Sequence, residues 1–115
     1  MLETILKEKI IESKWNTGII NGPKTYSDHR TGIDFYVYKI SLPKGYFNIG
    51  STERRPDKRK KEHKYQGKWW SNMVEYNTPM TILYKLGTRN EMLNKEKRLI
   101  KKHISKKKFL NDRPY

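Results

Sequence analysis

Short alternations of apolar and polar side chains divide the chain into helices and strands. Residues 2–13 carry leucine and isoleucine at helical spacing, which predicts an amphipathic helix. Residues 14–33 are rich in Gly, Asn, Pro, Ser and Thr, and they predict a loop with a weak strand at Thr17–Ile20. The clearest strand pattern, β-branched and aromatic almost throughout, covers residues 34–40. A Pro-Lys-Gly turn then leads into a return strand at residues 46–50, so the two strands predict a hairpin.

The second half of the chain predicts two helices and one more strand. A proline suited to the first helical turn opens a helix over residues 55–66. Two tryptophans and a methionine at residues 69–73 indicate a short helix or a packed loop, and residues 81–84 form a third strand candidate. A Thr-x-x-Glu capping box precedes a long helix over residues 89–104. The pattern predicts a small α+β domain: a three-stranded antiparallel sheet flanked by helices, with an extra N-terminal helix and loop.

Positive charge is concentrated in two blocks of the sequence. The chain of 115 residues has 26 Lys and Arg against 12 Asp and Glu, a net charge of +14. Residues 51–68 hold eight basic and three acidic side chains, and residues 101–115 hold six and one, so each block contributes a surplus of five. Clustered charge of this kind is typical of a surface that binds phosphates, and the sequence predicts a nucleic-acid partner.

Several other classes of protein fit the sequence poorly. No segment approaches the ~20 apolar residues of a membrane span. The aromatic residues lie in strand-like runs rather than opposite the lysines of a long amphipathic helix, which argues against a membrane-surface protein. The first residues carry acids and no small-residue cleavage site, so we expect no signal peptide. The absence of cysteine fits a cytoplasmic protein of a bacterium or an infected host cell.

Glu96 is an acidic residue within the apolar stripe of the final predicted helix. On a helical wheel it falls among Met92, Leu93, Leu99 and Ile100, while the neighbouring lysines occupy the remaining arc. A carboxylate in such a stripe must be compensated for its lost hydration. The residue pattern leaves two interpretations open. One is a buried or edge position with an ion pair, for example to Arg59, and the other is an oxygen ligand for Mg²⁺.

The predicted helix over residues 55–66 carries a second candidate group. Arg59 and His63 are four residues apart and share a helix face. They either belong to a solvated basic helix or bind a phosphate, for which the planar guanidinium of arginine is well suited. The solvated interpretation is expected in any case for the four lysines of this helix, namely Lys58, Lys60, Lys61 and Lys64. Tyr38, in the first predicted strand, is either a packing residue or a third member of the group.

Five short motifs follow one another over residues 35–111. They are Tyr36-Val37-Tyr38 with Lys39-Ile40, Asn48-Ile49-Gly50 with Ser51, the pair Arg59 and His63, Glu96-Lys97-Arg98-Leu99-Ile100-Lys101, and Leu110-Asn111. In this order and at these spacings they resemble the GIY-YIG nuclease superfamily, which includes intron homing endonucleases, some restriction enzymes and the incision subunit of bacterial excision repair. The resemblance implies a nuclease domain over residues 35–115, and residues 1–34 form an N-terminal extension without a counterpart.

Two positions depart from the family pattern. Tyr36 stands where the family has its first glycine, and Asn48 stands where it has its second tyrosine. In the family, both tyrosines lie close to the phosphate that is cut. Asn48 can form hydrogen bonds but cannot supply a phenolate, and Tyr46, two residues earlier, is expected to point to the same side of the strand.

The resemblance implies hydrolysis of phosphodiester bonds with one divalent ion, Mg²⁺ or Mn²⁺, held by Glu96. Tyr38 would accept a proton from the attacking water or position it, and Arg59 would stabilise the pentacovalent phosphorane. His63 and Asn111 would orient the phosphate and Glu96, respectively. Lysines would supply affinity that is independent of base sequence, with DNA favoured over RNA. These are Lys58, Lys60, Lys61, Lys64, Lys106, Lys107 and Lys108.

Three alternatives remain open at the level of sequence. Asn48 favours a GIY-YIG-like module that binds nucleic acid without cutting it. The lysine content is also compatible with a basic structural protein of a ribonucleoprotein particle. Finally, Trp69 and Trp70 could anchor a protein-binding surface, although adjacent tryptophans more often pack at the edge of a core. The small size and lysine content suit a protein of a phage or mobile element.

Overall fold

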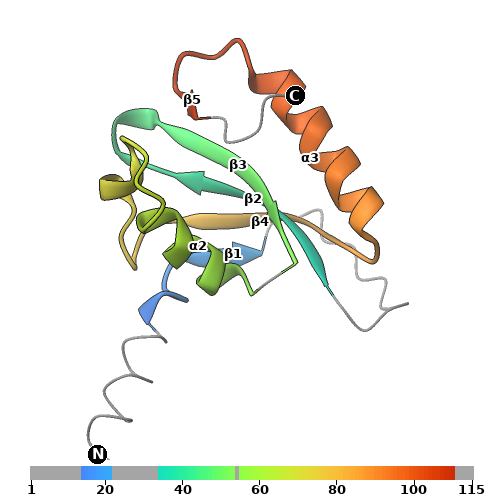
Figure 1. Ribbon diagram of the computed structural model, residues 1–115, viewed down its shortest axis with the longest axis horizontal. Coiled ribbons are helices and arrows are strands. Elements are labelled where there is room, and N and C mark those ends of the chain that lie inside the picture. Colours follow the sequence, from blue (N-terminus) through green and yellow to red (C-terminus); the bar gives the residue numbers. More distant parts are fainter. Residues whose placement is uncertain (1–13, 22–33, 54, 111–115) are drawn as a thin grey trace, which may run out of the picture.

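The computed structural model describes residues 14–21, 34–53 and 55–110 (Figure 1). Its elements in chain order are β1 (Ile19–Asn21), β2 (Phe35–Ser41), the 3-10 turn η1 (Pro43–Gly45), β3 (Phe47–Thr52), α2 (Pro56–Lys64), the 3-10 turn η2 (Ser71–Met73), β4 (Met80–Leu86), α3 (Arg89–His103) and β5 (Phe109–Leu110). The expected hairpin, the two later helices and the third strand are confirmed. The helix expected over residues 2–13 and the candidate site residue Asn111 lie outside the described residues.

A five-stranded mixed sheet forms the centre of the fold, with the strand order β1-β4-β2-β3-β5. The three central strands are antiparallel, as the sequence predicts, but the expected total of three strands is wrong. Two short outer strands extend the sheet, and both pair in parallel: β1 with β4, and β5 with β3. The weak strand predicted at Thr17–Ile20 overlaps β1, whereas β5, with two residues, is too short for an alternating pattern to reveal it.

An irregularity in the pairing of β2 with β4 decides which side chains share a face. Val37 pairs with Tyr84 and the next residue, Tyr38, pairs with Ile82, so Leu83 is the extra residue of a β-bulge. Tyr84 therefore lies on the Val37 face and Ile82 on the Tyr38 face. Without the extra residue, Ile82 and Tyr84 would lie on the same face.

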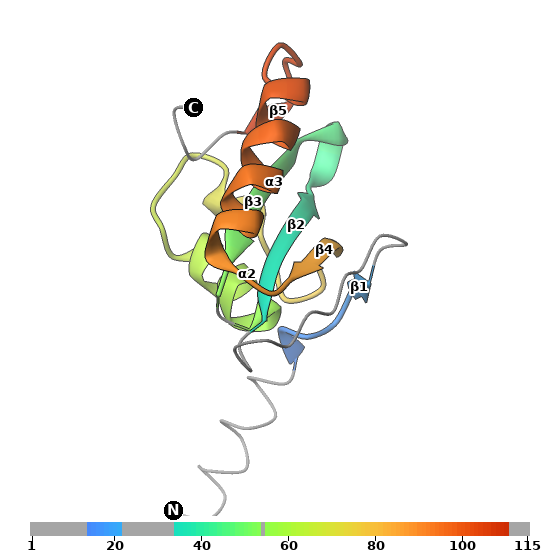
Figure 2. The same cartoon turned by 90° about the vertical axis from the view of Figure 1, so that its right-hand side faces the viewer.

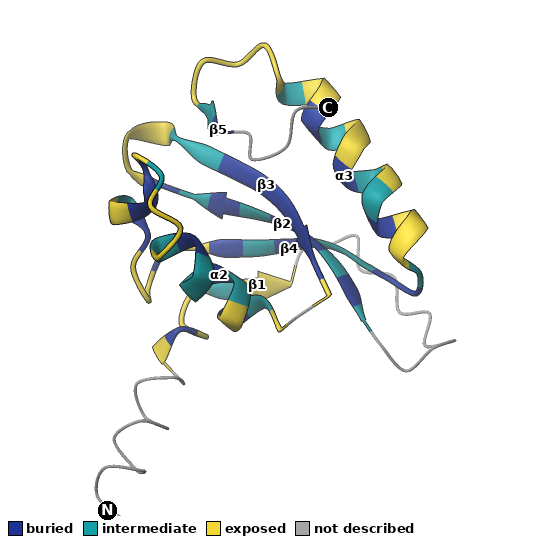
Figure 3. Ribbon diagram, in the orientation of Figure 1, coloured by how far each residue is buried: buried dark blue, intermediate teal, exposed yellow. Residues whose placement is uncertain are grey.

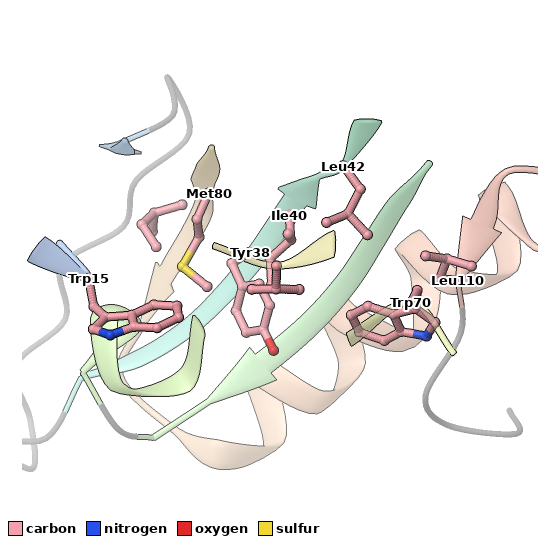
Figure 4. Packing of buried hydrophobic residues seen from close by; sticks show 9 residues of the cluster. Trp15, Tyr38, Ile40, Leu42, Trp70, Met80 and Leu110 are labelled. Atoms are coloured by element: carbon pink, nitrogen blue, oxygen red, sulfur yellow. The ribbon is translucent and has the colours of Figure 1, made fainter. Parts of the chain in front are cut away.

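Each face of the sheet has its own hydrophobic cluster. One cluster, drawn in Figure 4, contains Tyr38, Ile40, Met80, Ile82 and Leu110 from the strands together with Trp15, Leu42, Trp70 and Val74. The other contains Phe35, Val37, Ile49 and Leu86 from the strands together with Met92 of α3. Helix α2 lies on the Tyr38 face, since His63 contacts both Tyr38 and Trp70. Helix α3 covers the opposite face (Figure 2).

Helix α3 has the amphipathic character that its sequence predicts. Thr88 caps its N-terminus and accepts a hydrogen bond from the backbone of Glu91 at 3.2 Å. Its buried residues, Met92, Glu96 and Ile100, form a stripe against the sheet, while its outer side is exposed (Figure 3). Among the described residues, no helix is both long and apolar enough to cross a membrane.

Candidate active site

Tyr38 lies at the centre of the candidate site. It is fully buried in the middle of β2, and its hydroxyl is 2.6 Å from Nε2 of His63 on α2. Directly opposite on β3 is Gly50, where a Cβ atom would be 2.5 Å from the Tyr38 hydroxyl oxygen. The tyrosine ring thus crosses β3 at a position that only glycine leaves open. The Ile-Gly pair of the second motif is explained by this close approach.

Arg59 connects this buried pair to solvent. Its Nε donates to the Tyr38 hydroxyl at 3.2 Å, and its Nη1 donates to Glu62 at 3.0 Å. The Arg59 side chain is 20% exposed, whereas Tyr38 and His63 are fully buried. Burial lowers the pKa of Arg59, but Tyr38 and Glu62 outweigh burial, so the pKa is raised above its ordinary value. Arg59 is therefore a permanent cation at the outer end of the group.

The hydrogen bonds of the group place the Tyr38 oxygen between a cationic donor and an imidazole. Arg59 can only donate, so the Tyr38 oxygen accepts from it. The Nε2–H tautomer of His63 would donate to the Tyr38 oxygen, whereas with the proton on Nδ1 the unprotonated Nε2 accepts the Tyr38 O–H. Transfer of that proton would leave a phenolate stabilised by Arg59 and an imidazolium at His63. The structure thus brings Tyr38, Arg59 and His63 into direct contact.

Asn48 is also on the Tyr38 face of the sheet but has a different set of contacts. It is fully buried and stands opposite Ile40, two pairs along the strand from Gly50. Its Nδ2 donates to the carbonyl of Leu110 and so attaches β5 to β3. Its Oδ1 has no hydrogen-bond partner among the described residues. The structure thus shows a contact that holds an edge strand in place.

Tyr46 lies on the expected face, at some distance from the tyrosine-histidine pair. Its ring packs on the cluster around Tyr38 but makes its aromatic contact with Trp69, at 5.5 Å between centroids. The ammonium of Lys108 lies 4.8 Å from the centre of the same ring. The alternation of strand side chains predicts the direction correctly. It could not predict that the loop after α2 covers this end of the strand.

Glu96 is buried in the stripe of α3, with 1% of its surface exposed. It lies on the face of the sheet opposite to Tyr38, because α3 packs on the Val37 face. The ion pair with Arg59 considered above is wrong, since Arg59 bonds to Glu62 and Tyr38. Within the described part of the chain, no three His, Asp or Glu side chains are grouped as a metal site. A divalent ion at Glu96 would therefore have fewer than three such ligands from the described residues, which suits Mg²⁺ sites that retain water and phosphate ligands.

The lysines of α2 differ in exposure, and the prediction for Lys60 is wrong. Lys58 is exposed and Lys61 is half-buried, but Lys60 is fully buried. The Lys60 ammonium donates to the carbonyls of Thr17, Tyr76 and Thr78 at 2.7, 2.6 and 3.0 Å. Burial lowers the pKa of Lys60 to about 8, against an opposing effect of Asp57. This side chain joins loops of the protein and is unable to contact a phosphate.

The same helix face explains why Lys60 is misread from sequence. Asp57, Lys60 and His63, at intervals of three, form the buried side of α2. A helix that buries polar residues gives no hydrophobic periodicity, so its inner face has no apolar signal. Lys60 is three residues before His63, so it shares the helix face of a candidate site residue. This spacing was the one feature of the sequence that indicated an inward position for Lys60.

The remaining candidate lysines lie at the surface to different degrees. Lys64 is half-buried and donates to the Val74 carbonyl and to Glu75, at 2.9 and 3.0 Å. Lys106, Lys107 and Lys108 are exposed in the turn between α3 and β5.

The chain matches no protein-family model, and neither a curated protein nor a solved structure is significantly similar to it.

Proposed function

We propose that this protein is a metal-dependent endonuclease of the GIY-YIG type that hydrolyses phosphodiester bonds, with DNA as the favoured substrate. The observation that carries the proposal is the contact of the Tyr38 hydroxyl with both His63 and Arg59. These residues come from two elements and are 21 and 25 positions apart in sequence. An acid-base pair next to a fixed cation is the chemistry that phosphodiester hydrolysis requires.

In this proposal each residue of the group has one role. Arg59, the partly exposed member, binds the scissile phosphate and stabilises the phosphorane. Arg59 turns towards the phosphate and uncovers the buried Tyr38 hydroxyl, and Tyr38 then removes a proton from the attacking water after its own proton has passed to His63. The water oxygen bonds to phosphorus, the phosphorus–oxygen ester bond breaks, and the departing oxygen takes a proton from solvent. Because only Arg59 is open to solvent, we propose that the phosphate approaches from the side of α2.

Glu96 completes the proposed site from the other face of the sheet. Its carboxylate is a suitable oxygen donor for Mg²⁺ or Mn²⁺, and the bound ion would supply charge neutralisation at the phosphate. Only β3 separates the two faces here, and the Tyr38 ring reaches across that strand at Gly50. The pairing of β5 with β3 involves only Phe47 and Asn48 of β3. We therefore propose that the two halves of the site meet around the edge of β3 beyond Asn48.

The test is cleavage of supercoiled plasmid and single-stranded DNA with Mg²⁺ or Mn²⁺. Arg59→Ala should lower the rate by about 10²-fold or more, as loss of a charge-stabilising donor does. Tyr38→Phe should also lower it by about 10²-fold, because the ring remains but the proton acceptor is lost. Glu96→Gln keeps the buried volume and should abolish metal-dependent cutting. Glu91→Gln, an exposed acid of the same helix, is the matched control and should cut normally.

Two outcomes would contradict the proposal. Wild type that binds DNA but cuts nothing with either metal would exclude a nuclease. Cutting that resists a chelator would exclude the role of Glu96. Direct binding of Mn²⁺, measured by its paramagnetic broadening of backbone signals in α3, should be present in wild type and absent in Glu96→Gln.

The second candidate function is nucleic-acid binding without cleavage. The contact of Asn48 with the Leu110 carbonyl favours it, because the residue at the position of the second tyrosine has a structural role. This candidate predicts that Arg59→Ala weakens binding and that no variant changes a cleavage rate. The assay above separates the two functions, since binding and cutting are measured on the same DNA.

A further inference from the structure

One group of side chains outside the candidate active site combines an exposed aromatic ring with surrounding lysines. We call it the Trp69 surface, and its members are Lys44, Tyr46, Trp69 and Lys108. Trp69 is 68% exposed, in contrast to Trp70 at 3% and Trp15 at 7%. A single exposed aromatic residue is ordinary on a protein surface. The residues around Trp69 indicate a more specific role for its ring.

Three segments far apart in sequence meet at the Trp69 surface. The rings of Tyr46 and Trp69 are 5.5 Å apart at an angle of 83°, an edge-to-face contact that holds the indole in place. The Lys108 ammonium lies 4.8 Å from the Tyr46 ring centre and donates to the carbonyl of Lys44. Lys44 has a left-handed backbone, with φ of 62°, in the turn between β2 and β3. The surface therefore combines one open ring with the Lys108 ammonium, and the exposed Lys44 lies in the turn to which Lys108 is bonded.

The charged residues of the segments that build this surface are of one sign. The segments that build it, residues 35–52, 63–74 and 97–110, contain no Asp or Glu. Exposed lysines at its margin include Lys106 and Lys107, in the turn that carries Lys108. A partner must therefore be anionic and must offer a flat group to the indole. Phosphates alternating with bases meet both requirements, because every base has a π-face and every linkage a negative charge.

The position of the surface relative to the candidate active site points to the same partner. Trp69 adjoins Trp70, whose ring lies 5.4 Å from that of His63. The exposed ring and the proposed chemistry are thus on the same face of the sheet. A base stacked on Trp69 would belong to the strand that reaches Arg59. Bases inside a duplex are already stacked on each other, so only an unpaired base can use the ring.

We propose that Trp69 is a stacking platform for an unpaired base of a single-stranded or locally opened nucleic acid, with Lys44 and Lys108 on the flanking phosphates. The inference rests on the proposed function in taking nucleic acid as the partner. It goes further in naming an unpaired strand as the preferred form. The predicted protein-binding role of this surface becomes an alternative outcome of the test.

Tryptophan fluorescence provides the test, because Trp69 is exposed and the other two tryptophans are buried. Titration of full-length protein in chelator with an oligothymidylate of about a dozen nucleotides should quench the emission, and Trp69→Phe should remove most of the quenching. Heparin, a polyanion without bases, should bind without comparable quenching. A duplex of the same length should quench less than the single strand.

Variants separate stacking from general charge attraction. Trp69→Ala should weaken oligothymidylate binding about 10-fold or more, as loss of one stacked base does. Trp69→Phe should retain affinity within about threefold, because the phenyl ring still stacks. Tyr65→Ala, which removes another ring of similar exposure at 70%, is the matched control and should bind as wild type does. Circular dichroism melting of each variant excludes loss of folding as the cause.

Unchanged affinity in Trp69→Ala would overturn the proposal, as would equal quenching by heparin and by the single strand. Preferential quenching by an acidic peptide would overturn it in favour of a protein partner. The proposed nuclease function fails separately. Stacking without cleavage would support the role of Trp69 and refute the catalytic role of Arg59. Cleavage without stacking would support the role of Arg59 and refute that of Trp69.

Discussion

At the scale of single residues, Lys60 is a charged side chain with a structural role. Its ammonium donates hydrogen bonds to three carbonyl groups in buried or partly buried positions. Without Lys60 these carbonyls would lose this donor. The carbonyls belong to Thr17, before β1, and to Tyr76 and Thr78, before β4. Lys60 thereby connects α2 to the two loops that precede a pair of neighbouring strands.

Replacing Lys60 by methionine should destabilise the fold while preserving its volume. The three carbonyls would lose a donor, which costs about 1–3 kcal/mol for a buried polar group left unsatisfied. Urea unfolding of Lys60→Met and of Lys58→Met measures the difference, and the exposed Lys58 should change stability by less than about 0.5 kcal/mol. Equal stability of the two variants would show that the carbonyls do not depend on Lys60.

The lowered pKa of Lys60 also predicts a dependence on pH. With a pKa of about 8 in the folded state and 10.5 in the unfolded state, the unfolded chain binds more protons between these values. The free energy of unfolding attributable to Lys60 should therefore rise as pH increases from about 8 to 10.5. The difference in unfolding free energy between wild type and Lys60→Met, followed over this range, isolates the effect from other lysines and tyrosines. A difference that falls with pH would contradict the lowered pKa.

At the scale of elements, the outer strand β5 depends on side-chain as well as backbone contacts. The backbone of Phe47 donates to the carbonyl of Lys108 at 3.0 Å, and the Asn48 side chain donates to Leu110. A strand of two residues has few other attachments. Asn48 is therefore expected to determine whether β5 remains on the sheet.

Asn48→Asp should release β5, because a carboxylate oxygen would face the Leu110 carbonyl where an N–H now donates. We expect a loss of stability of about 1–3 kcal/mol and faster hydrogen exchange at the Phe47 amide. Asn72→Asp, at an exposed asparagine, is the control and should leave both unchanged. Slow exchange at Phe47 in Asn48→Asp would mean that the backbone contacts alone hold β5.

How far sequence predicts the elements depends on what each one buries. Helix α3 buries an apolar stripe, so its bounds, its cap and the inward position of Glu96 follow from periodicity. Helix α2 buries Asp57, Lys60 and His63, so only its i, i+4 pair of Arg59 and His63 was informative. The contact of that pair with Tyr38 required the family resemblance, because tertiary pairing has no local signal. Strands β1 and β5 are held by partners elsewhere in the chain and have little pattern of their own.

At the scale of the whole molecule, the net charge of +14 predicts nucleic-acid affinity that falls steeply with salt. Each phosphate contact that is lost should reduce the slope of log K against log salt by about 0.9 on duplex DNA. Replacing Lys106, Lys107 and Lys108 together by glutamine should therefore lower the slope by about 2–3 units if all three bind phosphates. Filter binding or fluorescence anisotropy at several salt concentrations measures the slope.

The buried lysine provides an internal control for that experiment. Lys58→Met should lower the slope, whereas Lys60→Met should leave it unchanged, although both remove one formal charge. An equal reduction in the two variants would show that net charge rather than direct contact controls the salt dependence.

The parallel pairing of the outer strands has a consequence for the order in which the protein folds. Ile19 pairs with Met80, 61 positions later, and Asn48 bonds to Leu110, 62 positions later. The β2–β3 hairpin, in contrast, closes over a turn of a few residues. Since long loops close more slowly than short ones, we expect the hairpin to form early and the two borders of the sheet to form last. During synthesis the β3 border must remain without its partner until residues 109–110 have been made, so a nascent chain that lacks these residues still exposes a strand edge to which another chain can pair.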